Sequence, residues 1–143
     1  MRMKRAITSL VAMVGLLTAA PVWAHHSFSA EYDANKPVKI RGTIVKVEWV
    51  NPHTWFYLDV KTPEGQVERW AIEGGNPGQL SRRGFTKDYL VPGTEIVVEG
   101  FMSKGQPHRA NGRSLTYPDG RTLFVGSPGT GAPTDGKDPS AER

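Results

Sequence analysis

A two-residue alternation between residues 54 and 61 is the feature that most constrains the fold. The apolar residues Phe56, Leu58 and Val60 alternate with the residues between them, which places them on one face of a β-strand. Strand-like segments also occur at 38–50, 67–73 and 94–101, and a closing hairpin is expected at 113–117 and 121–125 after a loop at 103–111. Sixteen glycines and eleven prolines in 143 residues are too many for a helical bundle. The sequence therefore predicts an all-β fold.

One short helix is expected between the third and fourth strands. Asn76 is a favourable N-cap residue, Pro77 suits the first helical position, and Gly84 can end the helix in a left-handed conformation. Three strands, a short helix and two more strands follow the order of an OB-type barrel. We therefore expect a small five- to six-stranded OB-like barrel, with a small sandwich as the competing architecture.

The first 24 residues have the pattern of an export signal. Residues 1–5 are basic, residues 6–20 are mainly apolar, and Val22 and Ala24 lie at the −3 and −1 positions of a cleavage site. We expect a signal peptide at 1–24, an N-terminal arm at 25–37, an OB-like barrel domain at 38–126 and a disordered tail at 127–143. Phe28 and Tyr32 are expected to attach the arm to the domain. The mature product would be periplasmic, with no membrane span after signal cleavage.

The charge distribution and the absence of cysteine narrow the possible partners. Three of the 18 basic residues lie in the expected signal, which leaves 15 basic residues against 14 acidic ones. Such a balanced chain lacks the positive field that favours nucleic-acid binding. The chain has no cysteine, which excludes a disulfide framework and lipid attachment to a cysteine.

The histidines are the most informative candidates for ligand chemistry. Cleavage after Ala24 would make His25 the N-terminal residue, so its α-amine and ring nitrogen could chelate one metal ion together with His26. His53 lies in the expected turn between the first two strands and could supply a third nitrogen. Neutral nitrogen ligands favour Cu(II), so the sequence predicts a divalent-metal site, copper preferred, at His25, His26 and His53. The alternative is that His25 and His26 are solvated and His53 only closes the turn.

A second set of candidates lies on the first three strands and at their ends. OB-type folds bind oligonucleotides and oligosaccharides on this part of the barrel, and exposed aromatic rings stack on such ligands. The ligand-binding candidates are Trp49, Asn51, Trp55, Tyr57, Trp70 and Glu73. They support an alternative function, a metal-free domain that recognises an envelope protein, a peptide or a glycan. Packing of these aromatic rings in the barrel, or under the arm, is the competing explanation.

The sequence contains no familiar catalytic motif. It has no G-x-S-x-G, no H-E-x-x-H, no phosphate-binding loop and no cysteine nucleophile. We therefore expect a binding protein and not an enzyme. A copper oxidase of the histidine-brace type is a third alternative. Such an enzyme would need an open coordination position beside a substrate surface.

The chain resembles an uncharacterised family of small exported bacterial proteins, a domain of unknown function. The resemblance extends over residues 25–126. It rests on His25-His26-Ser27-Phe28, Glu31-Tyr32-Asp33, Gly42, Val47-Glu48-Trp49, Asn51-Pro52-His53, Trp70, Glu73-Gly74-Gly75, Arg83-Gly84-Phe85, Pro92-Gly93, Gly100 and Pro118-Asp119-Gly120-Arg121. A more distant similarity to the bacterial exported OB-fold family implies a barrel. Neither resemblance implies a ligand, because fold does not specify function.

Overall fold

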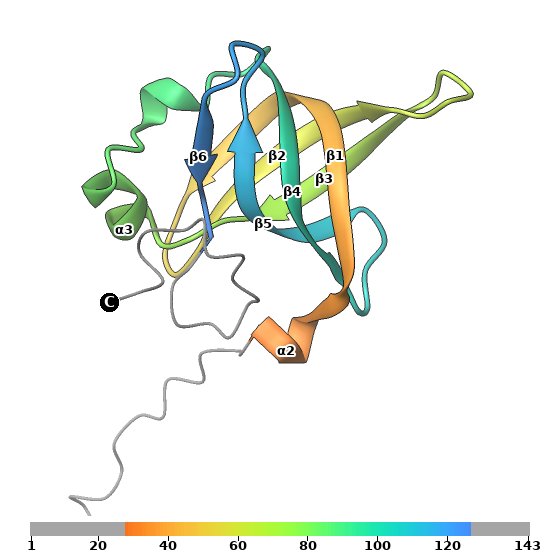
Figure 1. The fold of residues 1–143 in the computed structure, drawn as a ribbon, viewed down its shortest axis with the longest axis horizontal. Helices are drawn as coiled ribbons and strands as arrows, with labels where there is room; N and C mark the ends of the chain where they lie inside the picture. Colours follow the sequence, from red (N-terminus) through yellow and green to blue (C-terminus); the bar gives the residue numbers. More distant parts are fainter. Residues whose placement is uncertain (1–27, 127–143) are drawn as a thin grey trace, which may run out of the picture.

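A computed structural model describes residues 28–126 and shows a small β-barrel with short helices (Figure 1). The elements in chain order are α2 (Phe28–Glu31), β1 (Tyr32–Trp49), β2 (Thr54–Lys61), β3 (Val67–Glu73), α3 (Pro77–Arg82), a 3-10 helix (Lys87–Tyr89), β4 (Glu95–Ser103), β5 (Arg109–Thr116) and β6 (Thr122–Phe124). The predicted all-β barrel fold is confirmed, including the short helix between strands three and four.

Five strands close into a ring. The sheet order is β3-β2-β1-β4-β5-β6, and an additional pairing joins β3 to β5. That pairing is parallel and aligns Ala71, Ile72 and Glu73 with residues 109–111, whereas β6 pairs with β5. Residues 109–111 were expected in a loop, and this expectation is wrong. The backbone groups of these residues instead pair with β3 and complete the barrel.

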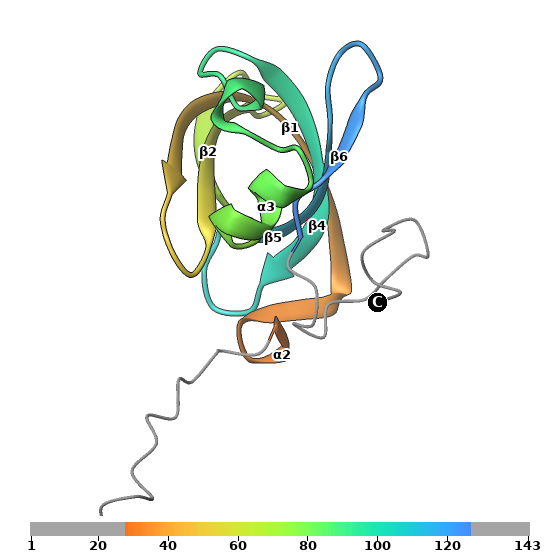
Figure 2. The ribbon, with the colours of Figure 1, turned by 90° about the vertical axis from the view of Figure 1, so that its left-hand side faces the viewer.

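The barrel interior is apolar, as the alternation in β2 predicts. Phe56 and Leu58 have no exposed surface, and Ile72 of β3 is equally buried. Helix α3 lies across one opening of the ring (Figure 2) and contributes the buried Leu80. The predicted cap is present, because the Asn76 side chain accepts hydrogen bonds from the backbone nitrogens of residues 78 and 79. The helix therefore closes one end of the core.

Strands β4 and β5 approach very closely at Gly100. The pairing register shifts between Glu99 and Gly100, and a Cβ atom at Gly100 would lie 1.9 Å from the carbonyl oxygen of Asn111. Only glycine allows this approach without displacing the backbone. The irregularity lies directly beside the β5 residues that pair with β3, and so helps to position them.

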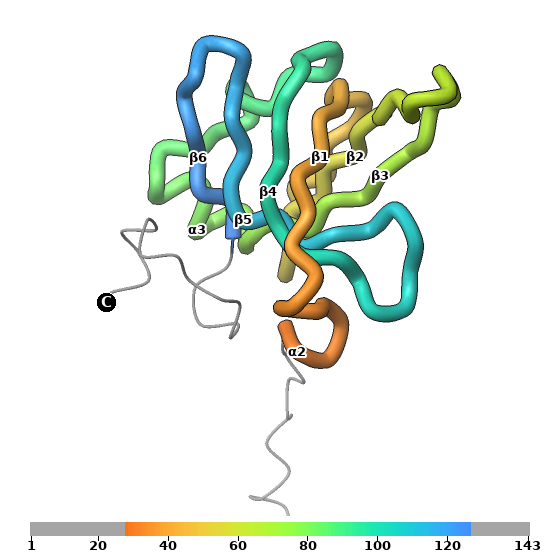
Figure 3. Tube along the Cα trace, turned by 45° about the vertical axis from the view of Figure 1, so that its right-hand side comes forward, coloured from red at the N-terminus to blue at the C-terminus, as the bar shows by residue number. Residues whose placement is uncertain are grey.

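The N-terminal segment is attached beneath the barrel. Strand β1 begins at Tyr32, six residues before the expected start at Val38, and pairs with β4 up to Ser103. Phe28 and Tyr32 are buried, as expected, and form a small apolar cluster with Phe101 that is separate from the main core. Figure 3 shows α2 below the lower ends of β1 and β4. Residues 28–37 are therefore packed against the barrel end.

Candidate functional site

A buried carboxylate lies at the end of β3, where the N-terminal segment meets the barrel. Glu73 is 7% exposed, and its Oε2 accepts a hydrogen bond of 2.5 Å from the Tyr32 hydroxyl. The Nη2 atom of Arg109 lies 3.6 Å from the same oxygen. Both groups compensate for the loss of water around the carboxylate, since a charge is buried at acceptable cost only when it is paired.

Arg109 joins three elements around this carboxylate. Its Nη2 contacts Glu31 Oε2 of α2 at 2.9 Å, and its Nε donates to the Tyr32 hydroxyl at 3.3 Å. The guanidinium carbon lies 4.7 Å from the ring centre of Trp55, within the range of a cation–π contact. The strand pairing explains this meeting, because Trp55 lies opposite Glu73 and β5 begins beside β3.

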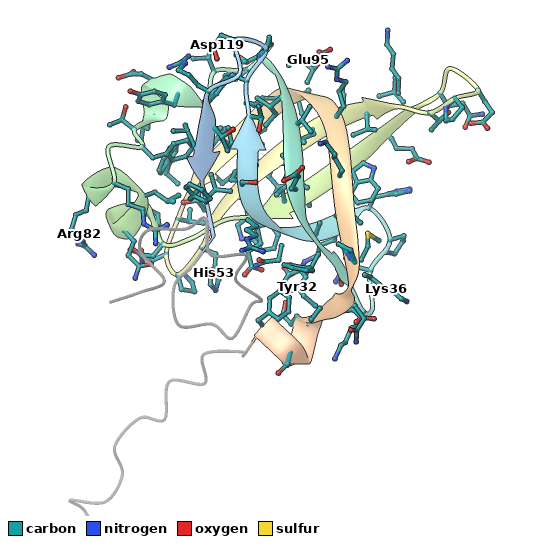
Figure 4. The ribbon with its side chains drawn as sticks, in the orientation of Figure 1. Tyr32, Lys36, His53, Arg82, Glu95 and Asp119 are labelled. Atoms are coloured by element: carbon teal, nitrogen blue, oxygen red, sulfur yellow. The ribbon has the colours of Figure 1, made fainter. Side chains whose placement is uncertain are left out.

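His53 lies against the other oxygen of the carboxylate. Its Nδ1 is 3.5 Å from Glu73 Oε1, and this nitrogen is buried without a hydrogen-bond partner among the described residues. The side chain as a whole is 26% exposed. Backbone hydrogen bonds of Thr54 with Gly74 and Gly75 hold the neighbouring backbone beside the end of β3. Figure 4 shows His53 and Tyr32 at the same end of the barrel.

We call Glu31, Tyr32, His53, Trp55, Glu73 and Arg109 the polar cluster. Burial, and then the hydrogen bond to the Glu73 carboxylate, raise the pKa of the Tyr32 hydroxyl above its usual value. The hydroxyl therefore stays protonated through the physiological range and continues to donate to Glu73. In this cluster, the partly exposed imidazole of His53 lies beside the Glu73 carboxylate, which Tyr32 holds by a hydrogen bond.

The predicted metal ligands are only partly within the described residues. His53 belongs to the polar cluster, whereas His25 and His26 lie outside the described residues. Within residues 28–126, no group of three or more histidine, aspartate or glutamate side chains could hold a metal ion. His108 lies in a different environment, with its Nε2 3.2 Å from Glu68 and its ring 5.3 Å from the Trp70 ring. The described part of the chain thus offers one histidine toward the predicted site.

The ligand-binding candidates divide between the two faces of the barrel. Trp49 and Trp70 pack against the main core. Trp55 and Tyr57 occupy the opposite face and are half-buried, with the Tyr57 hydroxyl donating to Glu48 at 3.0 Å. Asn51 is exposed, and its side-chain oxygen accepts from Asn76 at 2.7 Å. The structure therefore brings only Trp55 and Glu73, of these six residues, into direct contact with Arg109.

The sequence did not point to Glu31, Tyr32 or Arg109 as partners of Glu73. Tyr32 was expected only to attach the arm to the domain, Glu31 stood out only in the Glu31-Tyr32-Asp33 motif, and Arg109 fell in an expected loop. Tyr32 and Glu73 are 41 residues apart, and Arg109 and Glu31 are 78 residues apart. No local pattern connects residues at such separations. The available signal was the position of Glu73 at the end of an expected strand, directly before Gly74, beside the candidates His53 and Trp55.

Within the described residues, no helix combines the length and apolar character that crossing a membrane requires.

Comparison with known proteins adds a family and no function. Curated proteins gave no match to the chain. The model of a family of unknown function, DUF6152, matches residues 13–111. This range is more than half of the 143 residues and includes all six members of the polar cluster. The chain therefore belongs to this family of unknown function, DUF6152.

Proposed function

We propose that this protein is an exported periplasmic binding protein that holds a divalent metal ion, copper preferred, with His25, His26 and His53. One observation carries the proposal: the N-terminal segment is packed at the barrel end where His53 is partly exposed. This end of the barrel therefore carries both His53 and the first described residues of the segment that follows His25 and His26.

A series of contacts links His53 to Phe28 in the N-terminal segment. His53 contacts Glu73 at 3.5 Å, Glu73 accepts from Tyr32 at 2.5 Å, and the Tyr32 and Phe28 ring centres are 5.7 Å apart. His26 precedes Phe28 by two residues, a span of at most about 7 Å. His26 and His25 are thus within three residues of Phe28, a side chain that these contacts link to His53.

The donor set favours copper. Signal cleavage after Ala24 would provide the α-amine of His25 beside its own imidazole, and His26 and His53 would add two ring nitrogens. Such nitrogen ligands suit Cu(II), with Ni(II) and Zn(II) as weaker candidates. Because these ligands come from distant parts of the sequence, binding would stabilise the fold.

Copper titration of the mature protein beginning at His25 tests this proposal. We expect tight binding of one Cu(II), measured by competition with a chelator of known affinity, and a rise in melting temperature. His53→Ala should weaken binding at least about tenfold, since one of the nitrogen ligands is lost. One additional residue before His25 should abolish the thermal shift, because the α-amine is then displaced from the chelate.

His108→Ala is the matched control, because His108 is also a partly exposed histidine beside a glutamate but lies outside the polar cluster. It should bind copper like the unchanged protein. Equal affinities of His53→Ala and the unchanged protein would rule out the joint site. Native mass spectrometry of the protein from the periplasm would report both the true N-terminus and any retained copper.

The alternative function, a metal-free envelope interaction domain, receives less support from the described residues. Two of its tryptophans pack against the core. The outer rings of Trp55 and Tyr57 already have the cationic groups of Arg109 and Lys46 over them, 4.7 and 5.5 Å from the ring centres. A ligand that stacks on these rings would first have to displace those side chains. Unchanged tryptophan fluorescence with cell-wall sugars and peptides would count against this alternative.

A further inference from the structure

We propose that Glu73 is a positioning residue that holds His53 in the tautomer with its proton on Nδ1, which leaves Nε2 as the nitrogen that binds the metal. The role in metal binding rests on the function proposed above. The tautomer itself is a property of the metal-free protein, and can be measured without a metal.

The two ring nitrogens of His53 differ in their access to a ligand. Nδ1 of His53 is buried, although 26% of the side chain is exposed. The accessible part of the ring therefore excludes Nδ1. A metal ion arriving from outside the barrel would meet the ring through Nε2, provided that this nitrogen carries no proton.

Nδ1 of His53 faces the Glu73 carboxylate. Glu73 Oε1 lies 3.5 Å away, beyond the usual length of a hydrogen bond but close enough to tighten with a small movement. An ionised carboxylate can only accept, so a buried Nδ1 beside it is satisfied only as a donor. Leaving that buried nitrogen without a partner is unfavourable. The proton is therefore favoured on Nδ1.

Contacts to the other carboxylate oxygen keep Glu73 in this orientation. The Tyr32 hydroxyl donates a hydrogen bond to Oε2, and the Arg109 guanidinium forms an ion pair with the same oxygen. Arg109 also donates to the Tyr32 oxygen, which directs the tyrosine proton toward Glu73. Oε2 is thus held by one hydrogen bond and one ion pair, and Oε1 faces His53.

These contacts together form an arrangement typical of metal-binding histidines. Such residues usually donate their second ring N–H to a carboxylate, which fixes the tautomer and orients the ring. Here Glu73 would supply the carboxylate, with Tyr32 and Arg109 supporting it in turn. His53 is then oriented for a ligand before any metal binds.

Glu73→Gln gives the sharpest test because it keeps the shape of the side chain and changes one group. The amide oxygen should remain beside the donors Tyr32 and Arg109, which places the amide NH2 group against Nδ1 of His53. A donor at that position requires Nδ1 to accept, so the proton moves to Nε2. The metal-binding lone pair would then be blocked.

Long-range ¹⁵N–¹H NMR spectra of the metal-free mature protein distinguish the two tautomers. They should be recorded at increasing pH until the His53 nitrogen shifts no longer change. We expect the Nδ1–H form in the unchanged protein and the Nε2–H form in Glu73→Gln. Glu68→Gln is the matched control, because Glu68 contacts His108 at 3.2 Å and should leave the His53 tautomer unchanged.

Two results would overturn the inference: the Nε2–H form in the unchanged protein, or the Nδ1–H form in a folded Glu73→Gln variant. The first needs no variant, so the test survives a failure of Glu73→Gln to fold. Copper affinity separates this inference from the proposed function. Glu73→Gln should weaken binding about 10- to 100-fold. If only His53→Ala weakens it, Glu73 has no positioning role; if neither does, the metal site itself is wrong.

Discussion

The barrel interior and the polar cluster are built on the same strands but follow different physical rules. The interior is filled by inward-facing apolar residues such as Phe56, Leu58 and Ile72, which are fully buried. The polar cluster uses the outward-facing Trp55 and Glu73 of the same two strands, covered by Tyr32 and Arg109. One face of the sheet is thus buried by the barrel itself, and part of the other by the N-terminal segment.

The two regions stabilise the protein in different ways. Apolar side chains stabilise the interior without a required direction, since hydrophobic burial is non-directional. The polar cluster depends on particular donor and acceptor atoms, and a missing partner leaves a buried group unsatisfied. Changes in the interior should therefore affect the whole fold, whereas changes near the polar cluster should act mainly at one end of the barrel.

Phe56→Ala should have the largest effect. Phe56 is fully buried in the main core, and its removal leaves a cavity that the surrounding strands cannot fill completely. We expect the free energy of unfolding to fall by about 3–5 kcal/mol, measured by urea denaturation. Val67→Ala is the control, because Val67 is 58% exposed and its loss should change stability little. A similar stability for both variants would contradict the role of the barrel interior.

Phe28→Ala tests whether the N-terminal segment is a separate unit. Phe28 is 4% exposed and packs on Tyr32 and Phe101, apart from the main core. Losing its burial should cost about 2–3 kcal/mol. Hydrogen exchange should accelerate at residues 29–37 and much less in β2, because local units can open independently. Equal acceleration in both regions would show that the segment and the barrel open together.

Tyr32→Phe should have a smaller effect that depends on pH. The change removes the hydrogen bond to the Glu73 carboxylate, and should lower stability by about 2 kcal/mol at neutral pH. Because the folded pKa of Tyr32 is raised, the unfolded chain loses this proton first, near pH 10. The stabilisation is therefore complete below about pH 10 and declines as the pH rises above it.

The alkaline decline in stability should accordingly be steeper in the unchanged protein than in Tyr32→Phe. Urea denaturation between pH 8 and 11 measures it. Tyr57→Phe is the comparison variant: the pKa of Tyr57 is also raised, mainly by burial, but its hydroxyl donates to Glu48 outside the polar cluster, so its loss should reduce the decline less than the loss of the Tyr32 hydroxyl does. If Tyr32→Phe and the unchanged protein decline in parallel, the buried hydroxyl does not contribute as described.

Features of the barrel that depend on neighbouring residues could be predicted from the sequence, whereas the contacts of the polar cluster could not. The two-residue alternation in β2 and the Asn76–Pro77 helix start depend on neighbouring residues, and both were predicted correctly. The closure of the barrel by residues 109–111 was missed, because a parallel pairing with β3 leaves no local pattern. The meeting of Glu73 with Tyr32 and Arg109 depends on that closure. His53 was identified from residue type alone, without its carboxylate partner.

Lys39→Met should have the smallest effect, and it tests whether charge pairing stabilises the protein wherever it occurs. Lys39 Nζ lies 3.1 Å from Glu99 Oε1, but the two side chains are 71% and 53% exposed. Exposed pairs contribute little, so the loss should stay below about 0.5 kcal/mol. This loss of stability should vanish in 1 M salt, where the screening length is about 3 Å.

The loss of stability in Tyr32→Phe should persist in 1 M salt, because the Glu73 side chain is only 10% exposed and its contacts are poorly screened. Equal salt sensitivity of the two variants would show that the polar cluster is stabilised no differently from an exposed ion pair.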